Sequence, residues 1–251
     1  MTFARFKQKN PDTALIIFTR NPELGKCKTR LAKDIGDESA LEVYLYLIKQ
    51  CIRVIKNIEV DRYVFYSDKV ILNDVWDDSL FHKSKQEGHM LGLRMQNAFG
   101  DLFKIGYQRV VIIGTDLPDL NEHHINQAFE ALETHGYVIG PSKDGGYYLL
   151  GMKTNNDLLF KNKKWGESTV LKDTVKDIEG QTVYFLQELN DIDTFEDLKE
   201  DQSTLDRRIQ AYQDRLVTRY IAMERIVSSL QGSGGFLEGI LDRLPYTASN
   251  N

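Results

Sequence analysis

Cysteine, histidine and long apolar runs are scarce in this chain, and each scarcity excludes a class of protein. Two cysteines, Cys27 and Cys51, are too few for a disulfide framework or a cysteine-based metal site. The five histidines show no spacing typical of metal ligands. No apolar run approaches the roughly 20 residues of a membrane-spanning helix, and the N-terminus lacks the layout of a signal peptide. We therefore expect a cytoplasmic protein with no membrane span.

Excess basic charge and the common nucleotide-binding fingerprints are missing as well. The formal net charge is -5 at pH 7, which makes nucleic acid a poor partner. Neither G-x-x-x-x-G-K-[ST] nor G-x-G-x-x-G occurs, so P-loop hydrolysis and Rossmann redox chemistry lose most of their support. No Ser-His-Asp or Cys-His arrangement can be assembled from the spacing. The 41% hydrophobic content nevertheless suits a globular core.

Short apolar runs alternate with helical patterns over the first 200 residues. The runs ALIIFTR, RYVFYS and RVVIIGTD are followed by helical patterns over residues 38–56, 91–103 and 123–133. This alternation is typical of βαβ units, and uninterrupted apolar strands indicate a parallel sheet covered on both faces. Two further strands, YVIGP and GGYYLLGM, a helix over residues 168–178 and a last strand TVYFLQ follow. The predicted class is α/β.

The composition changes near residue 200. Residues 1–201 contain 19 lysines and seven arginines, whereas residues 202–251 contain six arginines and no lysine. Apolar residues recur there at spacings of three and four, which predicts a long helix with one apolar stripe. We predict a domain over residues 1–200 and a helical tail over residues 201–251. The tail is either an element for homo-oligomerisation or a foreign fusion.

The loop after the first strand, FTRNPELGKCKTRL, is rich in cations. Arg20, Lys28 and Arg30 follow the carboxyl end of a strand, where ligands bind in open α/β sheets. Lys and Arg beside backbone amides form a phosphate cradle. A solvated basic loop is the alternative, and the spacing does not decide between them. Cys27, in the same loop, is expected to be a small buried thiol.

Asp116 stands where the strand RVVII breaks at a glycine. A carboxylate at this place suits Mg²⁺ or Mn²⁺, which take oxygen ligands and share them with substrate phosphates. The alternative is a local role, in which Asp116 binds nearby amides. Asp119 or Asn121 is expected to cap the helix beginning near Glu122, with Asp119 preferred. His123 and His124 are expected at the surface of that helix.

A second acidic cluster, NDIDTFEDL, follows the last predicted strand. If the segment is extended, Asp191 and Asp193 share one side of it. Alternatively, Thr194 caps a helix that carries Glu196 and Asp197 in its first turn. Together with Asp116, this cluster offers a second carboxylate for one cation.

Two other stretches carry residues suited to a ligand. In GPSKDGGYYLLGM, Asp144 could bind a sugar hydroxyl or act as a base, and Gly145 and Gly146 let the backbone approach a ligand. A tight hairpin with Asp-Gly in its turn is the alternative. In KKWGEST, Trp165 could stack on a sugar or base, or be partly buried core.

The ordered set FTRNPELGKCKTRLA, LGLRMQNAF, IIGTDLPDL, GPSKDGGYYLLGM, WGESTVL and DIDTFEDL, over roughly residues 13–199, resembles the glycosyltransferase-like family associated with arsenosugar biosynthesis. That family has the GT-A fold of nucleotide-diphospho-sugar transferases, a three-layer α/β fold with a mostly parallel sheet. The chain departs from the family's pattern at Glu167, where a small or hydroxylated residue is expected. The tail lies outside the pattern and loosely resembles the C-terminal helix of a flagellar filament-cap protein, which, with its missing lysines, raises the hypothesis of a fused or misassembled segment.

The family resemblance implies roles for the candidate residues. Lys28 and Arg30, with Arg20 from the same loop, would contact phosphates. Asp116 and Asp193 would hold Mg²⁺ or Mn²⁺. Asp144, Gly145 and Gly146 would face the donor or acceptor, with Asp144 as a candidate catalytic base.

Three functions are compatible with these features, and we predict the first of them. It is metal-dependent transfer of a sugar from a nucleotide-diphosphate donor to a small acceptor. The second is nucleotidyl transfer from an NTP to a phosphorylated small molecule, because the lysine-rich first loop and the DIDT element are similar to those of phospholactate guanylyltransferases. The third is an inactive nucleotide-binding module joined to an oligomerising helix.

Overall fold

The computed structural model describes residues 12–203 of the chain. The first compact unit of the chain ends at Leu198. Nearly all of the predicted tail, from residue 204 onward, lies outside the described residues, so its helix and its proposed role stay predictions. None of the described helices is both long enough and apolar enough to cross a membrane.

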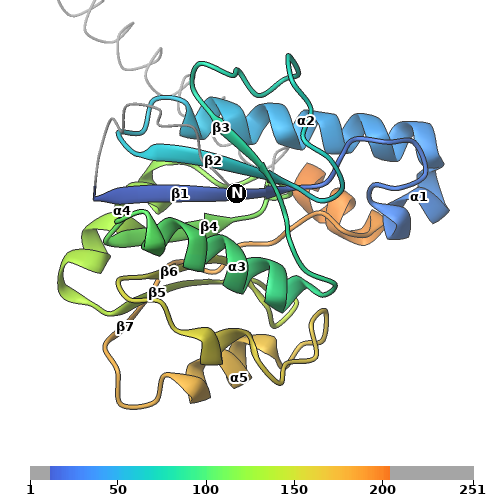
Figure 1. Ribbon diagram of the computed structural model, residues 1–251. Helices are drawn as coiled ribbons and strands as arrows, with labels where there is room; N and C mark the ends of the chain where they lie inside the picture. Colours follow the sequence, from blue (N-terminus) through green and yellow to red (C-terminus); the bar gives the residue numbers. More distant parts are fainter. Residues whose placement is uncertain (1–11, 204–251) are drawn as a thin grey trace, which may run out of the picture. The chain divides into compact units, whose positions relative to one another are not determined.

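A seven-stranded sheet forms the centre of the unit, in the order β3-β2-β1-β4-β6-β5-β7 (Figure 1). All neighbouring strands are parallel except β6, which runs antiparallel to both β4 and β5. The mostly parallel sheet predicted from the sequence is therefore confirmed, and β6 is antiparallel because a tight turn joins β5 to β6 and reverses the chain. The strands are β1 (Thr13–Thr19), β2 (Asp61–Tyr66), β3 (His82–Lys85), β4 (Arg109–Ile113), β5 (Tyr137–Pro141), β6 (Tyr147–Met152) and β7 (Val183–Phe185).

Helices cover both faces of this sheet and produce the three layers of the predicted GT-A fold class, which is confirmed. They are α1 (Thr29–Ile35), α2 (Asp37–Ile55), α3 (Leu91–Lys104), α4 (Glu122–Thr134), the 3-10 helix η1 (Asp157–Phe160) and α5 (Val170–Asp177). The apolar faces of α2 and α4 pack on one side of the sheet, and those of α3, η1 and α5 on the other. Alternate residues of β1, such as Leu15 and Ile16, are buried on opposite faces, which explains its continuous apolar run.

The start of α4 differs from the prediction in two ways. Asn121, not Asp119, caps the helix: its side chain accepts a hydrogen bond from the backbone N–H of His124. The imidazole of His124 accepts in return from the Asn121 N–H, so the two residues form a capping box. His124 is buried rather than at the surface. The sequence could not distinguish Asp119 from Asn121 as the cap of α4, because Asp and Asn both favour the N-cap position.

Candidate active site

The parallel strands β1, β2 and β4 bring their carboxyl ends to one edge of the sheet. In Figure 1 the orange segment that follows β7 reaches the same side of the sheet as α1. The loop after β1 is anchored by Asn21, whose side chain accepts from the Asp68 N–H at 2.9 Å and donates to the Lys69 carbonyl at 2.8 Å. Cys27 is buried as expected, and burial raises the pKa of its thiol. This cysteine is therefore a packing group and not an activated nucleophile.

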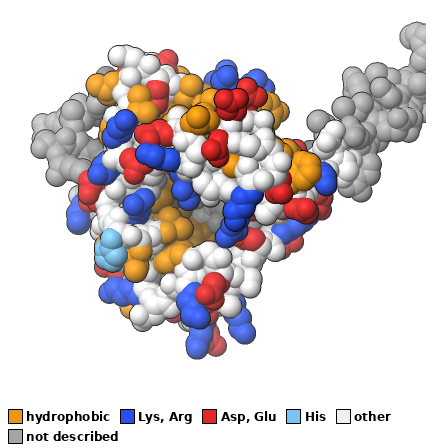
Figure 2. Space-filling model, turned by 90° about the vertical axis from the view of Figure 1, so that its right-hand side faces the viewer, with side chains coloured by type: hydrophobic (Ala, Val, Ile, Leu, Met, Phe, Trp, Pro, Cys, Tyr) orange, Lys and Arg blue, Asp and Glu red, His pale blue; other side chains and the backbone are white. Residues whose placement is uncertain are grey.

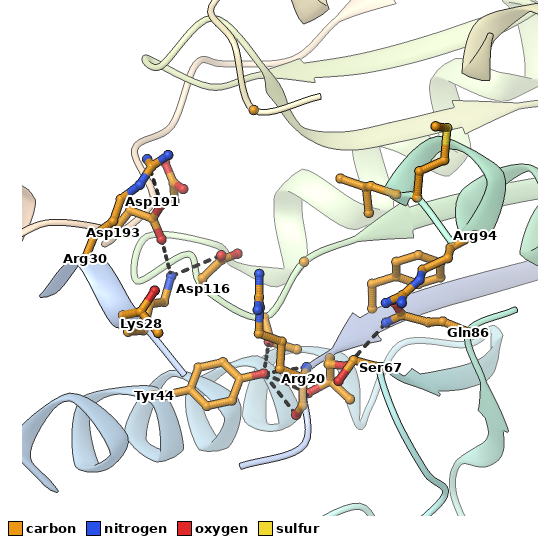
Figure 3. Close-up of a pocket in the computed structure, with 18 of the residues that line it drawn as sticks. Arg20, Lys28, Arg30, Tyr44, Ser67, Gln86, Arg94, Asp116, Asp191 and Asp193 are labelled. Carbon is orange, nitrogen blue, oxygen red and sulfur yellow. Dashed lines mark hydrogen bonds and ion pairs between the residues drawn. The ribbon is translucent and has the colours of Figure 1, made fainter. Parts of the chain in front are cut away.

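Lys28 is the central cation of the site. Its backbone has φ 48°, a left-handed conformation that is uncommon for lysine, and it immediately precedes α1. Its side chain is 5% exposed, and Nζ lies 3.1 Å from both Asp116 Oδ2 and Asp193 Oδ1 (Figure 3). Burial alone would lower the pKa of Lys28, but the two carboxylates more than offset it and raise the pKa. The ammonium is thus charged and held in place by its partners.

Asp116 follows β4 and is held close to the backbone. A Cβ added at Gly114 would lie 2.7 Å from Asp116 Oδ1, so any other residue at position 114 would clash with the carboxylate in its present position. The carbonyl of Asp116 accepts a hydrogen bond from the Ile192 N–H at 3.2 Å. That bond joins the end of β4 to the second acidic cluster, 76 residues later in the chain. The two acidic motifs therefore meet, as the sequence predicts.

The second acidic cluster is not helical up to residue 193 and is helical from residue 195. Ile192 is buried against Leu31 of α1 and Leu47 of α2. Asp191 and Asp193, on either side of it, both reach the carboxylate of Asp116. The carboxylate of Asp197 accepts from the backbone N–H groups of Asp193 and Thr194 at 3.0 and 2.7 Å. Asp191 and Asp193 thus both lie beside Asp116. Thr194 also caps the helix, because its hydroxyl accepts from the Asp197 N–H at 3.3 Å, and this cap positions Asp193.

Three carboxylates form a cluster that fits a divalent cation. One oxygen from each of Asp116, Asp191 and Asp193 lies within 4.8 Å of the others. Oxygen donors of this kind suit Mg²⁺ or Mn²⁺, which keep several waters and bind through a few carboxylates plus substrate phosphates. Asp191, which the sequence prediction left out of the metal site, is the third member. Its Oδ1 accepts from the Ser142 hydroxyl at 3.3 Å.

Metal binding at this cluster should weaken in mild acid. Burial, then the charges of Asp116 and Asp144, raise the pKa of Asp191 to about 6. Below that pH the carboxylic acid form dominates and the cation must displace a proton. The pKa of Asp191 is higher in the folded than in the unfolded chain, so protonation of Asp191 stabilises the metal-free fold in acid. This contribution to the free energy of unfolding is lost as pH rises through 6. We expect Mn²⁺ to raise the Tm clearly at pH 7.5 and little at pH 5. An equal rise at both pH values would contradict this.

A cavity of about 580 Å³ extends from the acidic cluster along the ends of β1 and β2. Figure 2 shows the face of the molecule on which it opens, with a central hollow flanked by basic, acidic and hydrophobic side chains. Four Lys or Arg residues line it: Arg20, Lys28, Arg30 and Arg94. Figure 3 shows Lys28 and Arg30 beside the carboxylates, Arg20 near Tyr44, and Arg94 beside Gln86. Positive charge is therefore distributed along the whole cavity.

Two buried polar side chains shape the wall of this larger cavity. The hydroxyl of Tyr44 accepts from the Arg20 N–H at 2.7 Å and lies 3.1 Å from Thr19 Oγ1. Gln86 donates to the Phe65 carbonyl at 2.9 Å, while its own carbonyl accepts from Arg94 at 3.3 Å. Tyr44, Gln86 and Arg94 were not predicted, because nothing in their spacing distinguishes them from other residues of amphipathic segments.

A smaller hollow of about 230 Å³ adjoins the larger cavity, and Asp116, Asp191, Gly114, Leu91 and Gly166 line both. Asp144, Gly146 and Trp165 line only the smaller one.

The Asp144 stretch also forms the hairpin turn that the sequence left as an alternative. The carboxylate of Asp144 accepts from the Gly146 N–H at 2.8 Å, and Gly145 has φ 86°. A Cβ at Gly145 would lie 2.2 Å from the Ser168 carbonyl oxygen. This close contact with the chain before α5 accounts for Gly145 without a ligand, although Gly145 was expected to face the donor or acceptor.

Comparison with known proteins relates most of the chain to transferases. A family described as "uncharacterized protein conserved in bacteria" (DUF2064) matches residues 50–167. The 2-phospho-L-lactate guanylyltransferase of Methanocaldococcus vulcanius is 27% identical over 188 residues, which is 74% of this chain and 83% of the relative. That of Methanocaldococcus jannaschii is 25% identical over 179 residues, 70% of this chain and 77% of the relative.

A solved structure from Desulfovibrio desulfuricans G20, described as a nucleotide-diphospho-sugar transferase, has 30% sequence identity to this chain and a TM-score of 0.68. The match covers 74% of this chain and 84% of that one.

Proposed function

The chain belongs to the nucleotide-diphospho-sugar transferase family and is a nucleotide-binding transferase, and on that premise we propose that it is a metal-dependent nucleotidyltransferase. Its donor is an NTP and its acceptor a phosphorylated small molecule. One observation carries this proposal: four Lys or Arg side chains line a cavity that ends at three clustered carboxylates. That combination suits a triphosphate together with a divalent cation.

The residues divide into three groups by role. Asp116, Asp191 and Asp193 would hold the cation, which when bound would offset negative charge on the leaving diphosphate. Lys28 and Arg30 contact the phosphates, where they stabilise the charge that grows as the leaving group departs. Arg20 and Arg94 support the remainder of the nucleotide. Arg94 is itself oriented by the Gly88 carbonyl, to which its Nε donates at 2.9 Å.

The reaction requires no protein base. An oxygen of the acceptor phosphate attacks the α-phosphorus of the NTP, a new P–O bond forms, and the bond between the α-phosphorus and the bridging oxygen breaks. Pyrophosphate leaves with the electron pair of that bond. The acceptor phosphate is already anionic at neutral pH, so Asp144 is not needed to remove a proton.

Product analysis tests this proposal. We expect pyrophosphate to be released from an NTP in the presence of Mg²⁺ and a phosphorylated acceptor. GTP is the first donor to try, because the archaeal relatives are guanylyltransferases. Coupled detection of pyrophosphate checks the outcome, with omission of metal as the control.

Sugar transfer is the second candidate, favoured by the 30% identical relative described as a nucleotide-diphospho-sugar transferase and by Asp144 beside the acidic cluster. It would release a nucleoside diphosphate from a nucleotide sugar and no pyrophosphate from an NTP. Release of neither product, with nucleotide still bound, would support the inactive binding module.

A further inference from the structure

We propose that the smaller hollow holds the body of the acceptor, meaning every part of it except the phosphate, and that it selects an uncharged, hydroxyl-bearing body. A sugar or polyol phosphate is therefore accepted, and a phosphorylated carboxylic acid is rejected. This inference rests on the proposed nucleotidyl transfer. It also separates the chain from the archaeal relatives, whose name specifies 2-phospho-L-lactate, an acceptor with a carboxylate.

The position of the smaller hollow suits an acceptor. It meets the larger cavity at Asp116 and Asp191, the carboxylates that would hold the cation between donor and acceptor. A molecule in the smaller hollow can therefore place its phosphate at the junction while its remaining atoms face β6 and α5. The shared residues Gly114 and Gly166 have no side chains, which leaves this junction open.

The charge of the smaller hollow argues against an anionic body. Four carboxylate residues line it, Asp116, Asp144, Glu167 and Asp191, and no Lys, Arg or His is among its described lining residues. A bound cation would balance Asp116 and Asp191 but not Asp144 and Glu167. Like charges placed together cost several kcal/mol, whereas carboxylates accept hydrogen bonds from hydroxyl groups readily. Lys164, at 3.7 Å from Glu167, offsets its charge only weakly, because the Lys164 side chain is 78% exposed.

The walls of the smaller hollow are rigid and aromatic. Tyr147, Tyr148 and Trp165 line it, and the rings of Tyr147 and Trp165 meet edge to face with centroids 6.5 Å apart. A Cβ at Gly92 would lie 2.4 Å from Trp165 Nε1, so α3 packs directly on the indole and holds it. A volume of about 230 Å³ admits only one small unit, since pockets for drug-sized ligands measure roughly 300 Å³ or more. An aromatic wall with acidic acceptors suits one sugar-sized ring.

Competing acceptors provide the test. With GTP and Mg²⁺, pyrophosphate release is measured for a set of hexose and pentose 1-phosphates and glycerol phosphate, and for 2-phospholactate and 3-phosphoglycerate. We expect kcat/KM to be at least about 100-fold higher for the best neutral-bodied acceptor, as several kcal/mol of charge repulsion implies. Preference for a phosphorylated acid, or use of no sugar or polyol phosphate, overturns the inference.

Variants locate the effect. Asp144→Asn and Glu167→Gln should each raise KM for the sugar or polyol phosphate several-fold, leave KM for GTP unchanged, and together reduce the discrimination against phosphorylated acids. Glu179→Gln, an exposed change of the same kind after α5, should alter nothing. Unchanged discrimination in the double variant overturns the inference.

Thermal shift with GTP and Mg²⁺ in the absence of acceptor is measured in parallel. No shift indicates that the proposed nucleotidyl transfer fails, whereas a clear shift with the wrong acceptor preference shows that only the inference on the acceptor fails.

Discussion

Replacing Lys28 by methionine is expected to strengthen binding of Mn²⁺ alone and to abolish most of the transferase activity. Nζ lies 3.1 Å from two of the three carboxylates, so the ammonium occupies part of the space that a cation would use and repels it. At a separation of about 5 Å, a divalent ion and an ammonium repel by roughly 1.7 kcal/mol even at the dielectric constant of water. Removing the charge should tighten Mn²⁺ binding about 10-fold, which calorimetry can measure.

Activity should change in the opposite direction. Without Lys28 the leaving phosphates lose a buried cation, and loss of one such contact costs about 10²–10³ in kcat. Lys26→Met is the matched control, because that lysine is in the same loop but its side chain is 66% exposed and pairs with Glu23. The hypothesis that Lys28 bridges the metal cluster and the phosphates would be wrong if the Lys28 variant lost Mn²⁺ affinity, or if it kept full activity.

Replacing Asp116 by asparagine is expected to reduce both metal binding and turnover by more than any other single carboxylate change. Asp116 is the only member of the cluster that lines both cavities and also pairs with Lys28. The change keeps the shape and removes the charge, so we expect a loss of about 10³ in kcat and the disappearance of the Mn²⁺-dependent rise in Tm. Asp119→Asn, three residues further along, should leave both properties intact.

Gly114→Ala provides an independent check on the same carboxylate. All charges remain, but the new Cβ would lie 2.7 Å from Asp116 Oδ1 and displace it. We expect Gly114→Ala to lose activity, but less than Asp116→Asn, and to keep nearly the same Tm in the absence of metal. This result would show that the position of the Asp116 carboxylate matters for activity. Full activity in Asp116→Asn would refute the metal site.

Patterns of neighbouring residues made much of this site predictable. Because Asp116 follows an apolar strand and the cationic loop follows another, both had to reach the carboxyl edge of the sheet if the strands were parallel. Asp191 and Asp193 were identified as a pair by their spacing of two. Spacing failed at α4, where Asn121 replaced Asp119 as the cap, and at His124, which proved to be buried.

Only the tertiary structure could bring residues distant in the chain into contact. Lys28 meets Asp116 across 88 residues and Asp193 across 165. The selection of Asp191 as a third carboxylate depends on Ile192, which is buried between α1 and α2 and directs its neighbours toward the end of β4.

The α/β class, the alternation of strands and helices, and the loops that carry charge follow from local sequence patterns, because each depends on periodicity within a few residues. The tertiary structure decided the reversed direction of β6, the partners of Lys28 and the separation of a basic cavity from an acidic, aromatic hollow. These three features depend on which side chains the packing of the sheet brings to one edge, and a local sequence pattern cannot predict that.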